Sequence, residues 1–244
     1  MSDIPAIVLG HGNPMNAIAR NSISAHWFLP TTKVSSSAAP RTIHDFGGFP
    51  LELYQVDYPA LGDPGLARRV QSLLSPLRVD ADDSWGLDHG TWSVLRHVYP
   101  NADVPVVQLS IQATQPAEFH FGLGRRLAPL RTEGVPIAGS GNLVHNLRAY
   151  AWGHRMIDPY DWAVRFENIV KHRILAGDLE SLVDYETLGT DAALSIPTPD
   201  HYLPLLYVLG AGRPGETIGF PVEGIEGGSI SMLAVRIGHK ESDA

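Results

Sequence analysis

Residues 5–14 read PAIVLGHGNP. Its first part, PAIVLG, is an apolar, strand-like run that ends in a glycine, and His11 follows directly. The stretches VPVVQLSI at 104–111 and VPIAGSGNL at 135–143 have the same β-branched character and are likewise interrupted by Gly or Pro. Short runs of this kind are typical of buried strands. The sequence therefore predicts a sheet that contains these three segments, with SISMLAVRIG at 229–238 as its final strand.

Three other segments have the pattern of amphipathic helices. PGLARRVQSLL at 64–74, the stretch at 116–134 that ends in Gly134, and DWAVRFENIVKHRILAGD at 161–178 repeat apolar residues near helical spacing, with charges opposite. Alternation of strands with such helices is typical of an α/β domain with helices on both faces of a mainly parallel central sheet. A chain of 244 residues suits one core, so we expect residues 1–244 to form a single domain.

The composition excludes several classes of protein. A formal net charge of -8, from 18 basic and 26 acidic residues, provides no basic surface for a phosphate backbone, so nucleic acid is not an expected partner. No window of the sequence is long and apolar enough to cross a bilayer. The start, MSDIPAIVLG, lacks the basic region of a signal peptide, and we therefore expect a cytoplasmic protein.

Four histidines stand beside apolar runs: His11, His26 in SISAHWF, His145 in IAGSGNLVHN and His201 in PTPDHYLPLLY. Because α/β sheets gather functional groups at the carboxyl ends of their strands, these imidazoles are candidates to bind one transition metal. The chain has no cysteine, so its metal ligands can only be nitrogen and oxygen. No short motif establishes a metal, and a single histidine is more often a surface or core residue; both interpretations stay open.

Two further stretches have a composition that suits a pocket. In IHDFGGFP, His44 and Asp45 precede two glycines, which fits either a loop at a pocket mouth or a plain turn. In WGLDHGTWSVL, His89 lies between Trp85 and Trp92, which suits a flat aromatic ligand or a filled core. We favour a role for His89 in substrate binding or in supporting the metal ligands.

One connection conflicts with a parallel sheet. If the run before His11 and the run ending at His26 are parallel neighbours, a crossover of roughly ten to twelve residues or more must join them. Residues 12–20 are too few for this crossover, and the polar start of RNSISAHW is a poor beginning for a central strand. We therefore hypothesise that the chain lacks a segment near Ala17 to Ile23.

Together these motifs resemble a known family. LGHGNPM, SAHW, TIHDFGGFP, WGLDHGTW, SGNLVHNLR and PTPDHYLPLLYVLGA are similar, in collinear order, to motifs of the class III extradiol ring-cleavage dioxygenases, the LigB-like family. The nearest resemblance is to the branch that contains the 4,5-DOPA dioxygenases. It extends from Ile4 to about Gly238 and implies a single α/β domain with a mixed central sheet.

The resemblance also implies a role for each histidine. His11, His26 and His201 correspond to the metal ligands of the family. His145 corresponds to a catalytic acid/base close enough to the metal to act as a further ligand in some forms, and His89 to a pocket histidine that assists substrate or oxygen binding.

The expected activity follows from these correspondences. Fe(II) would support cleavage of a DOPA-like catechol by O2 to a muconic semialdehyde, and a site of several histidines also suits Zn(II). Zinc has no redox chemistry, so two alternatives stay open: a zinc-dependent hydrolase, and an inactive relative that only binds ligands. We expect a monomer or a small homo-oligomer.

Overall fold

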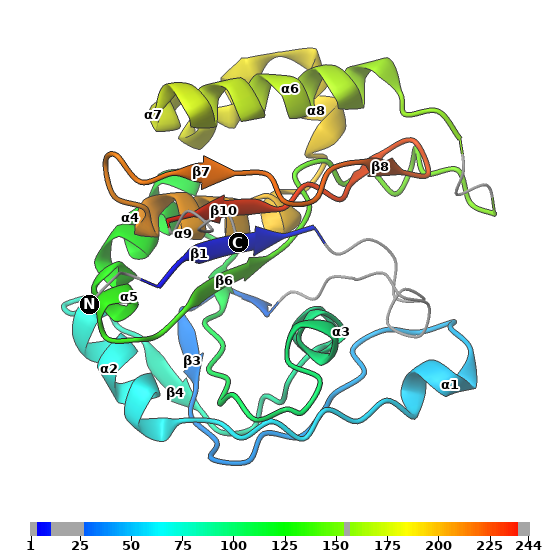
Figure 1. The fold of residues 1–244 in the computed structure, drawn as a ribbon. Coiled ribbons are helices and arrows are strands. Elements are labelled where there is room, and N and C mark those ends of the chain that lie inside the picture. The colour runs from blue at the N-terminus through cyan, green and yellow to red at the C-terminus, as the bar shows by residue number, and fades with distance from the viewer. Residues whose placement is uncertain (1–3, 11–26, 154–156, 239–244) are drawn as a thin grey trace, which may run out of the picture. The chain divides into compact units, whose positions relative to one another are not determined.

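The computed structural model of the protein describes residues 4–10, 27–153 and 157–238. The chain divides into two compact units. Figure 1 shows the fold, coloured by residue number from the N-terminus to the C-terminus. Unit 1 comprises Met1–Gly10 and Pro116–Ala244, and unit 2 comprises His11–Gln115. A single domain over the whole chain stays a prediction.

Unit 1 is built on a four-stranded sheet. Its strand order is β6 (Ile137–Ser140), β1 (Ala6–Leu9), β10 (Val235–Ile237) and β7 (Ile218–Gly219). β1 runs parallel to β6 and antiparallel to β10, and β10 runs antiparallel to β7. The predicted α/β fold with a mixed central sheet is therefore confirmed.

The parallel pair of strands determines where the chain leaves the sheet. Ala6 pairs with Ile137 and Leu9 with Ser140, so both strands end at the same edge. The chain then continues from β6 through Gly141, whose backbone N–H donates to the carbonyl of Leu9 at 3.2 Å. The residues that follow β6 are therefore held at the carboxyl edge of the sheet.

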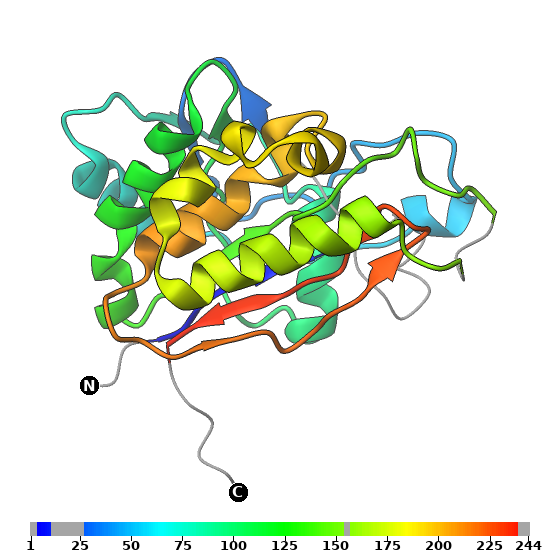
Figure 2. The ribbon, with the colours of Figure 1, turned by 90° about the horizontal axis from the view of Figure 1, so that it is seen from above.

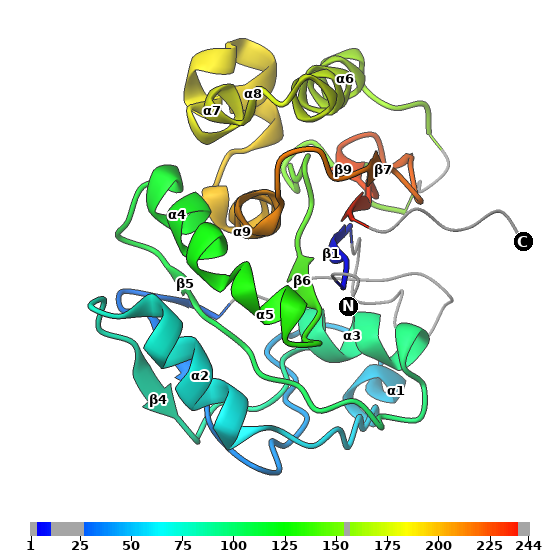
Figure 3. The same cartoon turned by 60° about the vertical axis from the view of Figure 1, so that its left-hand side comes forward.

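Two helices of unit 1 pack together and cover the sheet. Figure 3 shows α9 (Leu203–Ala211) between α4 (Ala117–Leu127) and β6. A Cβ added at Gly124 would lie 2.1 Å from the carbonyl oxygen of Tyr207, so the two helices touch through their backbones. α9 is apolar on all sides, as expected of a helix buried between a sheet and a second helix.

A second group of helices in unit 1 contains α6 (Asp161–Ala176). In Figure 2, α7 (Leu179–Val183) and α8 (Thr190–Ser195) lie beside it. The 3-10 turn η2 (Tyr185–Leu188) joins α7 to α8. α6 ends at Gly177, which adopts φ 72°, a left-handed conformation that favours glycine.

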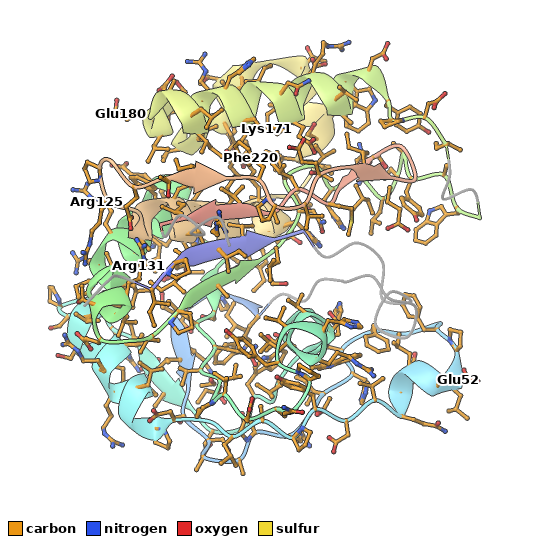
Figure 4. All side chains as sticks on the ribbon, viewed as in Figure 1. Glu52, Arg125, Arg131, Lys171, Glu180 and Phe220 are labelled. Carbon is orange, nitrogen blue, oxygen red and sulfur yellow. The ribbon has the colours of Figure 1, made fainter. Side chains whose placement is uncertain are left out.

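A buried arginine forms hydrogen bonds with separate segments of unit 1. Arg131 lies on the short helix α5 (Pro129–Thr132) and has no exposed surface. Its guanidinium donates to the carbonyl of Ile4 at 2.8 Å and to both carboxylate oxygens of Glu216, at 2.7 and 2.6 Å. It also donates to the carbonyl of Ala211 at 2.8 Å. Figure 4 labels Arg131 near the start of β1, where these contacts join three segments of the chain.

Unit 2 has short strands and a core that combines aliphatic and aromatic side chains. β2 (Phe28–Leu29) pairs in parallel with β5 (Ile111–Gln112), and β3 (Lys33–Ser35) with β4 (Asp80–Asp82), as two separate ladders. The core residues are Leu53, Tyr58, Ala60, Leu87 and Trp92, with Phe46, Phe49, Val56 and Leu95 against them. The elements of unit 2 are β2 (Phe28–Leu29), β3 (Lys33–Ser35), α1 (Leu51–Tyr54), α2 (Pro64–Leu74), β4 (Asp80–Asp82), α3 (His89–Val98) and β5 (Ile111–Gln112).

The predicted helices are confirmed. α2 occupies 64–74, and Asp63 caps it by accepting from the backbone N–H groups of Gly65 and Leu66. The segment 116–134 forms α4 and α5 and ends at Gly134, with φ 87°.

Two of the predicted strands are shorter than expected. Of 104–111, only Ile111 belongs to a strand, although Leu109 forms an isolated β-bridge with Val34. Pro105 has no N–H, and the N–H of Gln108 donates to the hydroxyl of Ser35 rather than to a carbonyl. The segment 229–238 is interrupted where the N–H of Leu233 donates to the hydroxyl of Ser231. It forms β9 (Ile230–Ser231), which pairs with β8 (Ile225–Glu226), and then β10.

The connection between His11 and His26 lies outside the described residues, as does the hypothesised missing segment. In the described sheet, β1 pairs with β6 and β10.

Within the described parts of the chain, no helix combines the length and apolar character that a membrane crossing needs.

Candidate functional site

Two of the predicted metal ligands, His145 and His201, lie against each other in unit 1. Their imidazole rings stack with 3.3 Å between centroids and 13° between planes. His145 follows β6 in the chain, and His201 ends the 3-10 turn η3 (Pro199–His201). The fold thus brings together two imidazoles that are far apart in the sequence.

The main chain determines this contact. A Cβ added at Gly141 would lie 2.3 Å from the carbonyl oxygen of His201, closer than real Cβ atoms approach. The backbone that leads from β6 to His145 therefore lies directly on the turn that carries His201. Only glycine allows this approach without a shift of one backbone against the other.

The main chain around His145 forms hydrogen bonds with two other segments of unit 1. Its backbone N–H donates to the carbonyl of Ser195 at 2.8 Å, and it forms an isolated β-bridge with Ile230. The N–H of Ser231 donates to the carbonyl of Val144 at 2.9 Å. His145 is thus a loop residue whose main chain is held as firmly as that of a strand.

A buried polar network supports the same segment. The side-chain amide of Asn142 donates to the carbonyl of Ser231 at 2.7 Å, and the Ser231 hydroxyl donates to the carboxylate of Glu167 at 2.5 Å. Burial raises the pKa of Glu167, although the hydrogen bond from Ser231 acts in the opposite direction. Sequence patterns did not indicate this network, because its members come from the loop after β6, from α6 and from β9.

An aspartate orients His201. Oδ2 of Asp200 lies 2.9 Å from Nδ1 of His201, whose side chain is only 8% exposed. A carboxylate bound to one ring nitrogen fixes the ring, so Nε2 is the nitrogen through which His201 would bind a metal. Outer carboxylates of this kind commonly accompany metal-binding histidines.

The described donor set fits a divalent metal with an affinity for nitrogen. Across residues 4–10, 27–153 and 157–238, no three or more His, Cys, Asp or Glu side chains are arranged so that together they could hold a metal ion. His11 and His26 lie outside those residues, so two of the four predicted ligands are placed. Two adjoining imidazoles, one of them oriented by a carboxylate, have the chemistry that Fe(II) or Zn(II) sites use.

In unit 2, Asp45 holds His89. Oδ1 of Asp45 lies 2.6 Å from Nδ1 of the His89 ring and accepts the His89 backbone N–H at 3.0 Å. Burial alone would raise the pKa of Asp45, but the hydrogen bonds and charge of His89 outweigh it and lower that pKa below 3.8. The sequence pointed to both residues separately; their contact was not predicted.

A second carboxylate, Asp88, begins the helix that carries His89. Its Oδ1 accepts the backbone N–H of Thr91 at 3.1 Å, and its Oδ2 accepts from the indole of Trp85 at 3.3 Å and the amide of Gln108 at 2.9 Å. Burial and the charge of Asp45 raise the pKa of Asp88, while the hydrogen bonds from Thr91 lower it. Asp88 thus fixes the N-terminus of α3 from within the core of unit 2.

The aromatic residues near His89 belong mainly to the core. Trp92 is fully buried and donates from its indole to the carbonyl of Ile43 at 2.9 Å. Nε2 of His44 lies 3.0 Å from the carbonyl of Val56, and the His44 ring packs beside Trp92 at 5.5 Å between centroids. Of the two interpretations of His44, the geometry favours a structural turn.

The chain is similar to proteins and structures that are already known. The model of the catalytic LigB subunit of aromatic ring-opening dioxygenase matches residues 22–223. A 4,5-DOPA dioxygenase extradiol of Escherichia coli (strain K12) is 49% identical, over 96% of this chain and 95% of its own. The protein of the same name from Beta vulgaris is 40% identical, over 78% of this chain and 71% of its own.

A solved structure supports the same relationship. The crystal structure of an uncharacterized protein from Escherichia coli K12 superimposes with a TM-score of 0.80 and 43% sequence identity. The match covers 96% of this chain and 100% of the other. These findings confirm the predicted family and fold, and with them the prediction of an enzyme of the extradiol dioxygenase type. The chain belongs to the LigB family of aromatic ring-opening dioxygenases.

Proposed function

We propose that the protein uses O2 to cleave the ring of a catechol that carries a DOPA-like side chain, at the extradiol position. The contact between His145 and His201 carries the proposal, because it joins two of the predicted ligands in one place. Relatives named 4,5-DOPA dioxygenase extradiol, 49% and 40% identical to this chain, support the choice of substrate.

Under this proposal His11, His26 and His201 hold the metal, and His145 is the acid/base beside it or a fourth ligand. Bound Fe(II) would supply open positions where a catechol and dioxygen become neighbours. Asp200 orients His201 through Nδ1. The donor set also suits Zn(II), which has no redox chemistry with which to activate O2.

Residues of the chain would accept the proton of the substrate and return it. His145 would take the proton of a catechol hydroxyl onto an imidazole nitrogen and return it as the ring opens. Both oxygen atoms of O2 enter the product, which is an open-chain muconic semialdehyde. The hydrogen bond from the His145 backbone to Ser195 holds the residue in place during this exchange.

Oxygen uptake tests the proposal. Protein reconstituted anaerobically with Fe(II) is expected to consume one O2 for each L-DOPA or simple catechol and to form a yellow ring-opened product. Zn(II)-loaded protein and a His145→Ala variant should lose this uptake. His172→Ala, a change at an exposed histidine of α6, is the matched control and should retain it.

Two results would contradict the proposal. Protein with confirmed Fe(II) content that consumes no O2 with any catechol is not a catechol dioxygenase. Turnover of an ester or amide by the Zn(II) form, without O2, would establish the zinc-dependent hydrolase instead.

A further inference from the structure

Asp45 and His89 form a close pair in unit 2, and the reaction described above assigns this pair no role. One oxygen, Oδ1 of Asp45, serves both the backbone N–H of His89 at 3.0 Å and the ring Nδ1 at 2.6 Å. The two side chains are 22% and 14% exposed. A single carboxylate oxygen therefore fixes the backbone and the ring of the same residue.

The ring of His89 is also held by packing. Phe46 lies edge-on to it, with 5.2 Å between centroids and 90° between planes. Phe46 in turn packs edge-on against Phe49 at 5.4 Å and beside Tyr54 at 5.1 Å. Because His89 is the first residue of α3, whose cap is the buried Asp88, its main chain also starts from a fixed point. The ring has little freedom to turn.

The carboxylate determines which ring nitrogen carries the proton. An ionised carboxylate only accepts hydrogen bonds, so the nitrogen 2.6 Å from it, Nδ1, must be the donor. The lowered pKa of Asp45 keeps it ionised at neutral pH. In a neutral imidazole with the proton on Nδ1, the other nitrogen, Nε2, is an acceptor. No hydrogen bond to Nε2 of His89 occurs among the described residues.

We infer that Asp45 is a positioning residue, which holds His89 in the Nδ1–H form and thereby presents Nε2 as an acceptor for a hydroxyl group of the bound substrate. Asp45 itself does not touch the substrate. The identity of the hydroxyl as that of a catechol rests on the proposed function, whereas the tautomer of His89 does not.

The inference distinguishes ligands by their hydroxyl groups. A phenolic O–H donates to Nε2, while a methyl ether at the same position can only accept. A site whose acceptor is left unpaired rejects such an analogue, because a buried polar group without a partner costs free energy. We therefore expect a catechol to bind in preference to its monomethyl ether, and Asp45→Ala to reduce that preference.

Nitrogen-15 NMR of the histidine rings tests the tautomer directly. His89→Gln assigns the His89 signals among the 11 histidines of the chain. In the metal-free protein, at a pH where the His89 ring is neutral, His89 is expected to show a protonated Nδ1 and an unprotonated Nε2. In Asp45→Ala the proton should move toward Nε2, the form that free histidine favours. Asp83→Ala, which removes an exposed carboxylate of unit 2, is the matched control and should leave the signals unchanged.

Kinetics then test whether Asp45 acts through His89. In the Fe(II) enzyme, Asp45→Ala should lower kcat/KM by about 10- to 100-fold, by analogy with the losses found when the carboxylate partners of metal-binding histidines are removed. In the His89→Gln background the same change should have no further effect, because the residue through which it acts is gone. Asp45→Leu removes the acceptor with a side chain of similar size and serves as the second variant if the alanine variant does not fold.

Failure of this inference and failure of the proposed function give different experimental results. An unchanged His89 tautomer in both Asp45 variants overturns the inference, whatever the activity. Equal losses from Asp45→Ala in the wild-type and His89→Gln backgrounds overturn it as well. If no catechol is consumed by the wild-type protein while the tautomer shifts as expected, the proposed function fails and the role of Asp45 toward His89 stands.

Discussion

The two units hold their candidate histidines in different ways. In unit 1, the approach of His145 to His201 depends on main chain against main chain, with Gly141 at the contact, although Asp200 also orients the His201 ring. In unit 2, His89 is positioned by a side chain, Asp45, on a helix that a second carboxylate caps. Backbone packing tolerates no added atom, whereas a side-chain hydrogen bond can be removed without moving the chain. The difference indicates which substitutions damage the fold and which change only the chemistry.

The largest effect is expected at Arg131, which is fully buried and joins three segments of unit 1. Arg131→Met leaves the carboxylate of Glu216 without its guanidinium partner and should lower the free energy of unfolding by about 3–5 kcal/mol. Denaturant unfolding measures the loss. Arg165→Met removes a guanidinium that pairs with Asp191 at the surface and should change stability little. A loss at Arg165 as large as that at Arg131 would contradict the importance of burial.

A change at Gly141 tests the main-chain contact itself. In Gly141→Ala the new methyl group would lie 2.3 Å from the His201 carbonyl, so the two backbones must separate. We expect a loss of about 1–3 kcal/mol in stability, as in other overpacked sites, and weaker metal binding because the histidine pair is displaced. Denaturant unfolding and metal titration measure the two effects.

Gly122 provides the control for this substitution. It lies within α4, and a Cβ added there would meet no atom within 4 Å. Gly122→Ala should therefore stabilise the protein by roughly 0.5–1 kcal/mol and leave metal binding unchanged. If Gly141→Ala behaves like Gly122→Ala, the histidine pair is not positioned by the close backbone contact.

The sequence predicted what depends on local pattern. The helices at 64–74 and within 161–178 were evident from the spacing of apolar residues, and β1 and β6 from their β-branched runs. The extent of strand in 104–111 was not, because it depends on which group accepts the N–H of Gln108. Such a choice is made by tertiary contacts.

The same division applies to the candidate site. Resemblance to a family pointed to His145 and His201, and the structure places them in contact. The partners of the histidines were not indicated, since Asp45 precedes His89 by many residues and no local pattern joins them. Pairing of a histidine with a distant carboxylate is visible only in three dimensions.

The smallest effect, a dependence on pH, compares one carboxylate from each unit. Burial alone would raise the pKa of Glu216 and of Asp45, but Arg131 lowers the first below 4.5 and His89 lowers the second below 3.8. A carboxyl group whose pKa is lower in the folded than in the unfolded chain stabilises the fold above its unfolded pKa, and this contribution is lost as pH falls through the folded pKa. Both contributions should therefore be complete at neutral pH and decline below about pH 4.

Unfolding free energies measured across this acid range, for Glu216→Gln and Asp45→Asn beside the wild type, test the comparison. Each variant should be less stable than the wild type at neutral pH and approach it in acid, because the wild-type carboxyl is then protonated as well. Glu216→Gln should show the greater convergence, since its partner Arg131 is buried and always charged, whereas His89 is charged only when protonated. Greater convergence for Asp45→Asn would mean that the Asp45–His89 pair of unit 2 contributes more to stability than the pairing of Glu216 with the buried arginine of unit 1.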